Sequence, residues 1–228
     1  MDAETEHYDV AVIGAGPVGA VAAFAYADRG ERVCLLEANP RAAARFAGEW
    51  LHPPGKQILD ELGMGPIQAA EEHQPGRGFV VYPDDMGVPI RLPYVDEASA
   101  ISCHHKWFVG ELREQAKQLD NVDYRPYVRA SNVEPGSVEC LDARTRESDE
   151  ISADLIVGAD GRSSAARKAL ESEDNLNVVS FMGALTLEDF ELPYDGYGHV
   201  LLGGPGPILM YRIAPDAVRV SIDVPSEF

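Results

Sequence analysis

Apolar residues in the first forty positions follow the pattern of a strand, a glycine turn, a helix and a second strand. Residues 8–13 form a short run rich in β-branched side chains, and the alanine-rich stretch 20–28 favours helix. A second apolar run, residues 32–36, follows Gly30 and ends beside Glu37. A right-handed crossover would pair the two strands in parallel. The pattern therefore predicts an α/β fold that opens with a Rossmann-like, dinucleotide-binding βαβ unit.

The remainder of the chain alternates predicted helices and strands and then becomes all strand. Periodicity predicts helices over 53–62, 107–119 and 162–170, a hairpin over 78–93, and strands over 122–127, 137–141 and 151–157. From 177 to 224, glycine and proline turns separate four apolar runs, which predicts an antiparallel meander. We therefore expect an FAD/NAD(P)-binding domain over residues 1–175, with a hairpin insertion near 77–105. The start of a β-sheet substrate domain is expected over 176–228.

Charge narrows the classes of partner. The chain has 38 acidic and 19 basic side chains, a formal net charge of -19. Such a surface repels nucleic acid phosphates and anionic membranes. No apolar run approaches the roughly 20 residues of a membrane span, and the acidic start lacks the basic region of a signal peptide. We expect a cytoplasmic protein that binds neither nucleic acid nor membrane.

The three cysteines predict neither a disulfide framework nor a metal site. Cys34, Cys103 and Cys140 show no paired spacing, and three thiols cannot all form disulfides. His104 and His105 follow Cys103 directly, but neighbouring residues of an extended segment point to opposite faces. No metal is therefore expected.

The glycines between the first strand and helix point to a dinucleotide. Gly14 permits a tight turn, Gly16 lets the backbone approach a pyrophosphate, and Gly19 lets the helix pack on the sheet. The helix N-terminus then faces phosphate charge. Glu37 ends the second strand, where a carboxylate accepts hydrogen bonds from a ribose and disfavours a 2′-phosphate. The tightly bound nucleotide should be FAD or NAD, and not NADP.

A second glycine motif separates these two cofactors. Residues 154–164 read Asp-Leu-Ile-Val-Gly-Ala-Asp-Gly-Arg-Ser-Ser, an apolar strand that ends in a turn at Asp160. An Asp-Gly pair by itself only predicts a turn. The whole segment resembles the one that flavoprotein monooxygenases of the hydroxybenzoate hydroxylase class place beside FAD.

Several separated segments resemble the squalene epoxidases within that class. Residues 45–55 have the family's Arg, Gly-Glu, aromatic and Pro-Gly series, and residues 103–108 have its His-His and aromatic series. Leu112-Arg113, Asn121-Val122 and the strands at 203–211 and 218–224 follow at matching spacings. The resemblance spans about residues 8–228 and covers only the N-terminal part of the family.

The resemblance implies a set of cofactor contacts. It places Pro17 and Val18 over the pyrophosphate, Glu37 and Ala38 at the ribose, Arg45 and Arg113 on the flavin nucleotide, backbone near Val128 or Arg129 at the adenine, Trp50 close to the flavin and Asp160 beside the cofactor. No catalytic side chain is identified, because the cofactor carries the chemistry in this class.

The sequence also departs from the family. Phe79 stands where the family carries an active-site Tyr, so a hydroxyl is missing near the expected substrate position. The family's membrane-binding helices, its Gly-Asp-Ala motif and the C-terminal helices that close the pocket have no counterpart. We also expect the last strand of the meander to leave an open edge. Its cover would be a complementary C-terminal half from another polypeptide, the rest of a longer chain, or self-association.

The resemblance implies an FAD-dependent monooxygenase. Reduced FAD would react with O2 to give a C4a-hydroperoxide that passes one oxygen atom to an apolar or polyketide-like substrate. NAD(P)H or a separate flavin reductase would supply the electrons.

Two alternatives remain open: an aromatic-ring hydroxylase of the same class, or a non-catalytic FAD-binding subunit that needs a second polypeptide. A flavin halogenase is disfavoured because the Trp-x-Trp-x-Ile-Pro signature is absent.

Overall fold

The computed structural model of the chain describes residues 5–44, 46, 49–69, 73–85, 87–170 and 177–227. The chain divides into two compact units. Unit 1 comprises residues 1–45 and 108–174, and unit 2 comprises residues 46–107 and 175–228. No β-sheet of the described residues is shared between the two units.

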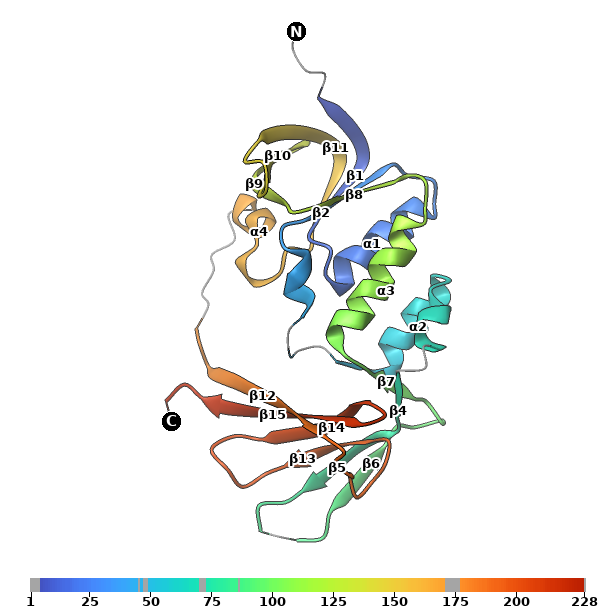
Figure 1. Cartoon of the computed structure of the whole chain (residues 1–228), viewed down its shortest axis with the longest axis vertical. Helices are drawn as coiled ribbons and strands as arrows, with labels where there is room; N and C mark the ends of the chain where they lie inside the picture. The colour runs from blue at the N-terminus through green and yellow to red at the C-terminus, as the bar shows by residue number, and fades with distance from the viewer. Residues whose placement is uncertain are drawn as a thin grey trace. The chain divides into compact units, whose positions relative to one another are not determined.

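Unit 1 contains a mixed sheet in the strand order β8-β2-β1-β11-β10-β9 (Figure 1). Strands β1, β2, β8 and β11 pair in parallel, and β10 pairs antiparallel with β11 and β9. The elements are β1 (Glu6–Ile13), α1 (Pro17–Ala27), β2 (Val33–Glu37), the 3-10 helix η1 (Pro40–Ala43), α3 (His105–Lys117, which begins in unit 2), β8 (Val122–Pro126), β9 (Val128–Glu134), β10 (Ser137–Asp142), β11 (Ser148–Gly158), the 3-10 helix η3 (Gly161–Ser163) and α4 (Ala165–Ala169). The predicted βαβ unit and its parallel pairing are confirmed.

The apolar runs of the sequence form the core of unit 1. Every residue of β2 is buried, as expected of a parallel strand that is covered on both faces. In α3, Phe108, Leu112 and Ala116, which helical spacing in the sequence puts on one face, are all buried. Each such Leu or Phe contributes about 1.5–3 kcal/mol when fully buried. Burial of these runs therefore holds the helices on the sheet.

A local signal begins α1, and a distant side chain bonds its end. Pro17 occupies its first turn, where a missing N–H costs nothing. The Asn121 side chain donates to the carbonyls of Ala27 and Glu31, at 2.8 and 2.6 Å. Asn121 thus satisfies carbonyls at the end of the helix and ties the start of β8 to them.

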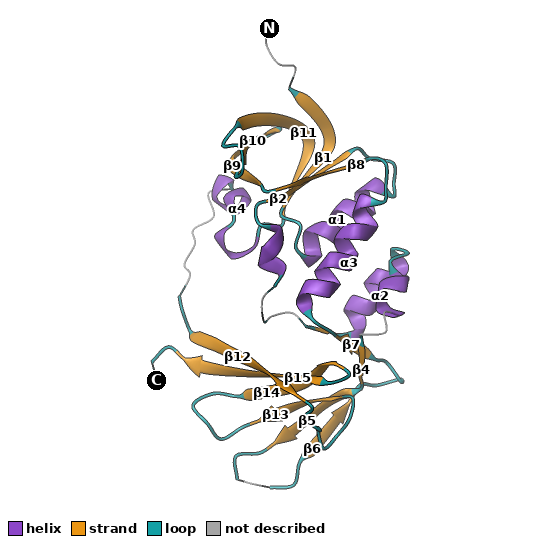
Figure 2. Cartoon of the chain, viewed as in Figure 1, coloured by secondary structure: helices purple, strands orange, loops and turns teal. Residues whose placement is uncertain are grey.

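Unit 2 is built mainly from strands (Figure 2). A six-stranded sheet has the order β12-β15-β14-β13-β5-β6, and a small sheet has the order β3-β7-β4. The elements are β3 (Trp50–Leu51), α2 (Pro53–Glu61), the 3-10 helix η2 (Gly65–Ala69), β4 (Gln74–Gly76), β5 (Gly78–Tyr82), β6 (Ile90–Pro93), β7 (Ala100–Ser102), β12 (Ser180–Glu188), β13 (Tyr197–Leu201), β14 (Ile208–Ala214) and β15 (Ala217–Pro225). None of the helices in the described part of the chain is both long and apolar enough to cross a membrane.

The expected C-terminal meander is wrong in its order. Strands β13, β14 and β15 do form a meander, but β12 pairs with β15 and not with β13. Strand β15 is therefore an interior strand, and β12 and β6 are the edges of the sheet. The interior place of β15 also removes the open edge expected at the end of the chain.

The compact units divide near residue 175, where the sequence predicts a boundary, but residues 46–107 belong to unit 2 and not to the unit with the βαβ fold. The predicted hairpin forms, since β5 and β6 pair antiparallel, but β5 also pairs in parallel with β13. This long-range pairing places residues 46–107 in one unit with residues 175–228. No local pattern distinguishes a hairpin that stands alone from one that extends a distant sheet.

A buried ion pair holds the strands of unit 2 together. The Arg219 guanidinium donates to both carboxylate oxygens of Glu49, at 2.7 and 2.8 Å, and both side chains are at most 2% exposed. Tyr211 also donates to Glu49, and Arg219 donates to Thr186. Burial raises the pKa of Tyr211, so its phenol remains a donor at neutral pH. The pair therefore links β12, β14 and β15 to the segment before β3.

All three thiols are free and buried. Burial raises the pKa of Cys34 and Cys103 to about 12, and that of Cys140 to about 11. A thiolate is the reactive form of cysteine, so these thiols are protonated and shielded at neutral pH.

We predict that the native chain reacts slowly with a thiol-specific disulfide reagent at pH 8. The rate should be at least ~100-fold below that of the urea-unfolded chain, because raised pKa values and burial both reduce accessible thiolate. Absorbance of the released thiolate measures both rates. Three thiols should react after unfolding, and a fast-reacting thiol in the native chain would contradict the burial.

Candidate cofactor-binding site

The predicted cofactor residues of unit 1 gather at one edge of its sheet. Gly14 follows β1, Glu37 ends β2, Val128 follows β8 and Asp160 follows β11. These strands are parallel, so their carboxyl ends meet at the same edge, which is where ligands bind in open α/β sheets.

Packing within the protein requires two of the three glycines. Gly14 has a φ of +96°, and a Cβ there would lie 2.6 Å from the carbonyl oxygen of Ala159. A Cβ on Gly19 would lie 1.7 Å from the carbonyl oxygen of Gly14. Gly14 thus lets the turn pass against the segment before Asp160, and Gly19 lets α1 pack on the turn.

Gly16 is different, because no described protein atom requires a glycine there. Its φ of -70° and ψ of -175° are open to any residue, and a Cβ would meet nothing within 4 Å. Gly16 precedes α1, whose first N–H groups favour an anion. Open space at this helix N-terminus fits the close approach of a pyrophosphate.

Arg113 and Glu37 form a buried network around the glycine turn. The Arg113 side chain donates to the Ala15 carbonyl at 2.6 Å, to the Pro40 carbonyl at 3.0 Å and to Glu37 Oε2 at 2.9 Å. Glu37 Oε2 also accepts from Ala15 N–H at 3.1 Å, and Oε1 accepts from Asn39 N–H at 2.7 Å. Arg113 and Glu37 therefore hold the turn, the end of β2 and η1 in one arrangement.

This network gives both residues a structural task that the sequence does not reveal. A carboxylate oxygen accepts up to two hydrogen bonds, and Glu37 Oε1 has one donor among the described residues. A guanidinium has five donors, and three bonds from Arg113 are formed. Both groups retain capacity for a ligand, so their cofactor roles stay predictions.

Asp160 presents an unpaired acceptor. Its Oδ2 accepts from the Ala165 N–H at 2.6 Å, but its buried Oδ1 has no partner in the described part of the chain. A buried acceptor without a donor is costly. A hydroxyl donor from a bound cofactor would satisfy it, so Asp160 fits the predicted site.

The other predicted residues are spread over the two units. Val18 is 72% exposed at the start of α1, Ala38 and Arg129 are exposed, and Val128 is half-buried. Arg45 lies outside the described residues. Trp50 and Phe79 both lie in unit 2.

Trp50 and Phe79 belong to an aromatic cluster in unit 2. Their ring centroids lie 5.3 Å apart, and Trp50 meets Tyr211 edge-on at 5.7 Å. Tyr94 OH accepts from Trp50 Nε1 at 3.0 Å and lies 2.7 Å from His52 Nδ1. Burial raises the pKa of Tyr94, so it stays a neutral phenol. Trp50, Tyr94 and His52 therefore form a hydrogen-bonded series, and the Phe79 ring packs against Trp50.

Tyr94 places a hydroxyl beside Phe79, the residue that stands where the family carries Tyr. The ring centroids of Phe79 and Tyr94 lie 6.4 Å apart. Sequence reasoning missed Tyr94 and His52. The predicted hairpin carries a usable signal, because its register pairs Gly78 with Pro93 and so brings Tyr94 beside the start of β5.

Within the described residues, no three His, Cys, Asp or Glu side chains gather in a group that could hold a metal ion. His104 contacts the Trp107 ring, at 5.2 Å between centroids. Cys103 and His105 are buried at the start of α3.

Comparison with known proteins identifies a family model and full-length relatives. The FAD-binding domain model, FAD_binding_3, matches residues 7–202. Squalene monooxygenase SE1 of Panax ginseng is 33% identical over 225 residues, which cover 96% of this chain and 42% of the relative. Squalene epoxidase erg1 of Aspergillus fumigatus is 34% identical over 232 residues, with 96% and 47% coverage. The chain thus spans less than half the length of these curated relatives.

Solved structures share the fold at low identity. A p-nitrophenol 4-monooxygenase from Pseudomonas putida superimposes with a TM-score of 0.81 and 18% identity, covering 98% of this chain and 60% of that one. A probable FAD-dependent monooxygenase from Pseudomonas aeruginosa gives 0.80 and 20%, with 97% and 62% coverage. The predicted squalene epoxidase resemblance and Rossmann-like fold are confirmed.

We predict strong coupling between Arg113 and Glu37. Arg113→Met should lower the free energy of unfolding by about 3–5 kcal/mol, because it leaves the Glu37 carboxylate buried without its charge partner. Adding Glu37→Gln should recover part of this loss, which urea denaturation of both single variants and the double variant would measure. Arg32→Gln is the control, since its pair with Glu6 is about half exposed and should cost under ~1 kcal/mol. Additive losses would show that the network does not act as a unit.

Proposed function

Because the chain belongs to the FAD-binding domain family, we propose that it binds FAD at the carboxyl edge of the unit 1 sheet and serves as the cofactor-binding part of a monooxygenase. The observation that carries the proposal is Gly16, whose missing side chain is explained by no neighbouring protein atom. The similarity to squalene epoxidases supports FAD over NAD and monooxygenation over other flavin chemistry.

Each predicted contact has a physical role in this proposal. The N-terminus of α1 binds the pyrophosphate, with Pro17 and Val18 beside it. Glu37 Oε1 and Ala38 meet the ribose, and the backbone at Val128 or Arg129 meets the adenine. Arg113 adds its remaining donors. The unpaired Asp160 Oδ1 accepts from a cofactor hydroxyl, which removes the cost of leaving that oxygen buried without a donor.

Bound FAD would activate O2, so that one oxygen atom enters the substrate and the other leaves as water, with two electrons from NAD(P)H or a separate reductase. In unit 2, we assign Phe79 to contact with an apolar substrate, and the neighbouring Trp50 to contact with the flavin, as the resemblance implies. Both rings are half-buried and tilted against each other at 5.3 Å between centroids, and such aromatic surfaces bind flat or apolar groups. The Tyr94 hydroxyl holds His52, whose ring lies 5.8 Å from that of Phe79 between centroids.

We also propose that activity requires polypeptide beyond these 228 residues. The squalene epoxidase relatives have more than half of their length outside the matched part. The additional segment is either part of a longer chain or a separate subunit. Under the second arrangement, this chain alone would be an FAD-binding subunit.

We predict that Gly16→Ala weakens FAD binding and leaves the fold intact. The added methyl meets no protein atom, so the melting temperature without FAD should be unchanged, but it enters the space assigned to the pyrophosphate. Fluorescence titration should show a Kd raised at least ~10-fold, equivalent to about 1.4 kcal/mol. Gly110→Ala is the matched control, because that glycine in α3 also has open space around it. Equal FAD affinity of Gly16→Ala and wild type would remove the main support for the site.

We predict that the isolated chain retains FAD but does not oxygenate substrate. A mixture of the chain, FAD, a flavin reductase, NADPH and squalene should give no epoxide in product extracts, because the expected pocket is incomplete. A full-length squalene epoxidase under the same conditions is the positive control. Epoxide formed by this chain alone would show that the additional polypeptide is dispensable.

A further inference from the structure

Tyr127 has a backbone conformation that residues with a Cβ rarely adopt. It is the single residue between β8 and β9, and its φ is +66°. This left-handed region is costly for residues other than glycine, because the Cβ crowds the following carbonyl oxygen. Residues in such a conformation persist only where their surroundings hold them, and they cluster at functional sites.

The hairpin between β10 and β11 holds Tyr127 in this conformation. The Tyr127 carbonyl accepts from the Ala143 N–H at 2.8 Å. Asp142 Oδ1 accepts from the N–H groups of Arg144 and Thr145, at 2.7 and 3.1 Å, and Asp142 Oδ2 lies 3.5 Å from Arg144 Nη2. The Arg144 guanidinium lies over the Tyr127 ring, 4.8 Å from its centroid. The hairpin therefore fixes both the backbone of Tyr127 and a cation over its ring.

The contact with Arg144 does not by itself explain a tyrosine at this turn. The Arg144 side chain is 61% exposed, and an exposed cation–π pair contributes no more than the left-handed backbone costs. No aromatic ring of the described residues packs against Tyr127. The Tyr127 ring is half-buried, so part of its surface is open to a ligand.

The strand order of unit 1 indicates which part of FAD reaches Tyr127. Strands β1, β2 and β8 lie side by side in that order, and neighbouring strands are about 4.8 Å apart. The pyrophosphate is assigned to the turn after β1, and the ribose to Glu37 at the end of β2. Glu37 is in register with Pro126, the last residue of β8, so Tyr127 follows directly beside the ribose position. The adenine is attached to this ribose and therefore reaches the end of β8.

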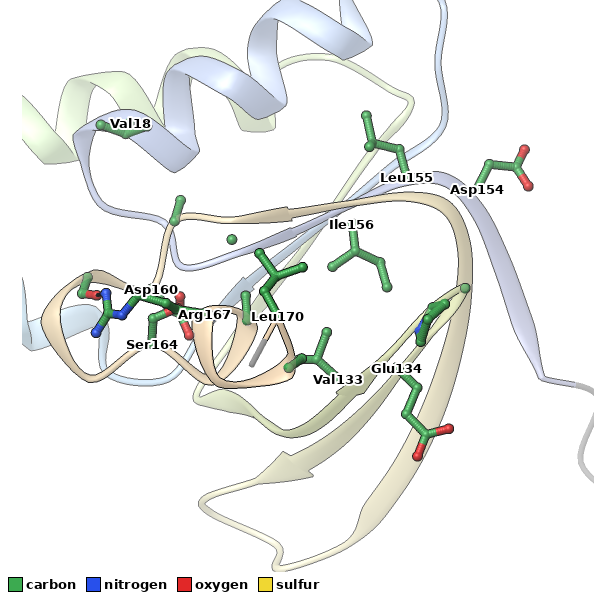
Figure 3. A pocket seen from close by; sticks show the side chains of 17 residues that line it. Val18, Val133, Glu134, Asp154, Leu155, Ile156, Asp160, Ser164, Arg167 and Leu170 are labelled. Carbon is green, nitrogen blue, oxygen red and sulfur yellow. Dashed lines mark hydrogen bonds between the residues drawn. The ribbon is translucent and has the colours of Figure 1, made fainter. Parts of the chain in front are cut away.

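The other predicted contacts lie in the opposite direction along the same edge. Val18 at the start of α1 and Asp160 after β11 line a hollow of about 800 Å³ (Figure 3). Strand β11 is the neighbour of β1 on the side away from β2 and β8. A dinucleotide that crosses the N-terminus of α1 and offers a hydroxyl to Asp160 therefore has its adenosine on the side of β2 and β8.

We propose that the Tyr127 ring stacks on the adenine of FAD, while Arg144 supports the ring from its other face. The inference rests on the proposed function, in which FAD binds at this edge of the sheet. Aromatic side chains bind bases through their π faces, without a particular pattern of hydrogen bonds. The Tyr127 side chain thus adds a stacking contact to the backbone contact assigned to Val128 or Arg129. The gain in FAD binding offsets the cost of its left-handed backbone.

Fluorescence titration of the full chain with FAD tests the proposal. Tyr127→Gly removes the ring and adopts a left-handed φ freely, so the turn should form while the FAD Kd rises at least ~10-fold. Tyr127→Asn is a second variant without the ring, because asparagine also tolerates this conformation. Tyr127→Phe keeps the ring and should retain the wild-type Kd. Asp189→Gly is the matched control, since Asp189 also has a positive φ, +50°, but lies in unit 2.

NMR of bound FAD gives a second readout. The ring current of Tyr127 should shift the adenine H2 resonance upfield in wild type and Tyr127→Phe, but not in Tyr127→Gly. The proposal is overturned if both variants without the ring bind FAD as tightly as wild type, if Tyr127→Phe loses as much affinity as they do, or if the H2 resonance is the same in all chains. Failure of the wild-type chain to bind FAD would instead refute the proposed function, whereas equal binding by wild type and Tyr127→Gly refutes only the role of Tyr127.

Discussion

The buried ion pair between Arg113 and Glu37 is the interaction on which the candidate site depends. It connects α3 to the end of β2 and, through Ala15, to the turn that precedes α1. A buried charge without a partner costs several kcal/mol, so each residue is stable there only in the presence of the other. The glycine turn is thus held by side chains that lie 76 residues apart in the sequence.

Unit 2 uses the same physical device for a different purpose. Arg219 and Glu49 form a two-bond pair that is more deeply buried than the pair in unit 1. Its additional partners, Thr186 and Tyr211, lie on neighbouring strands, so the pair sets how β12, β14 and β15 pack on the segment before β3. In unit 1 the pair shapes a backbone turn for a ligand, whereas in unit 2 it fixes the sheet beneath the aromatic cluster.

The segment after β11 lies against the glycine turn, although the two are far apart in the sequence. A Cβ on Gly14 would lie 2.6 Å from the carbonyl oxygen of Ala159, so the turn and this segment pack directly on each other. The next residue is Asp160, whose buried Oδ1 has no partner in the described part of the chain. The turn and the end of β11 therefore form one side of the candidate site together.

The sequence alone determined the βαβ unit, the glycine turn, the α3 core face and the family, because each depends on local periodicity or on motifs of adjacent residues. It also named Glu37, Arg113 and Asp160. Only the tertiary structure decided that Arg113 binds Glu37 and Ala15, that β12 pairs with β15, that β5 joins β13, and that Tyr94 lies beside Phe79. Such pairings join residues far apart in the chain, and they are selected by packing and by the cost of burying charge, for which a single sequence contains no periodic signal.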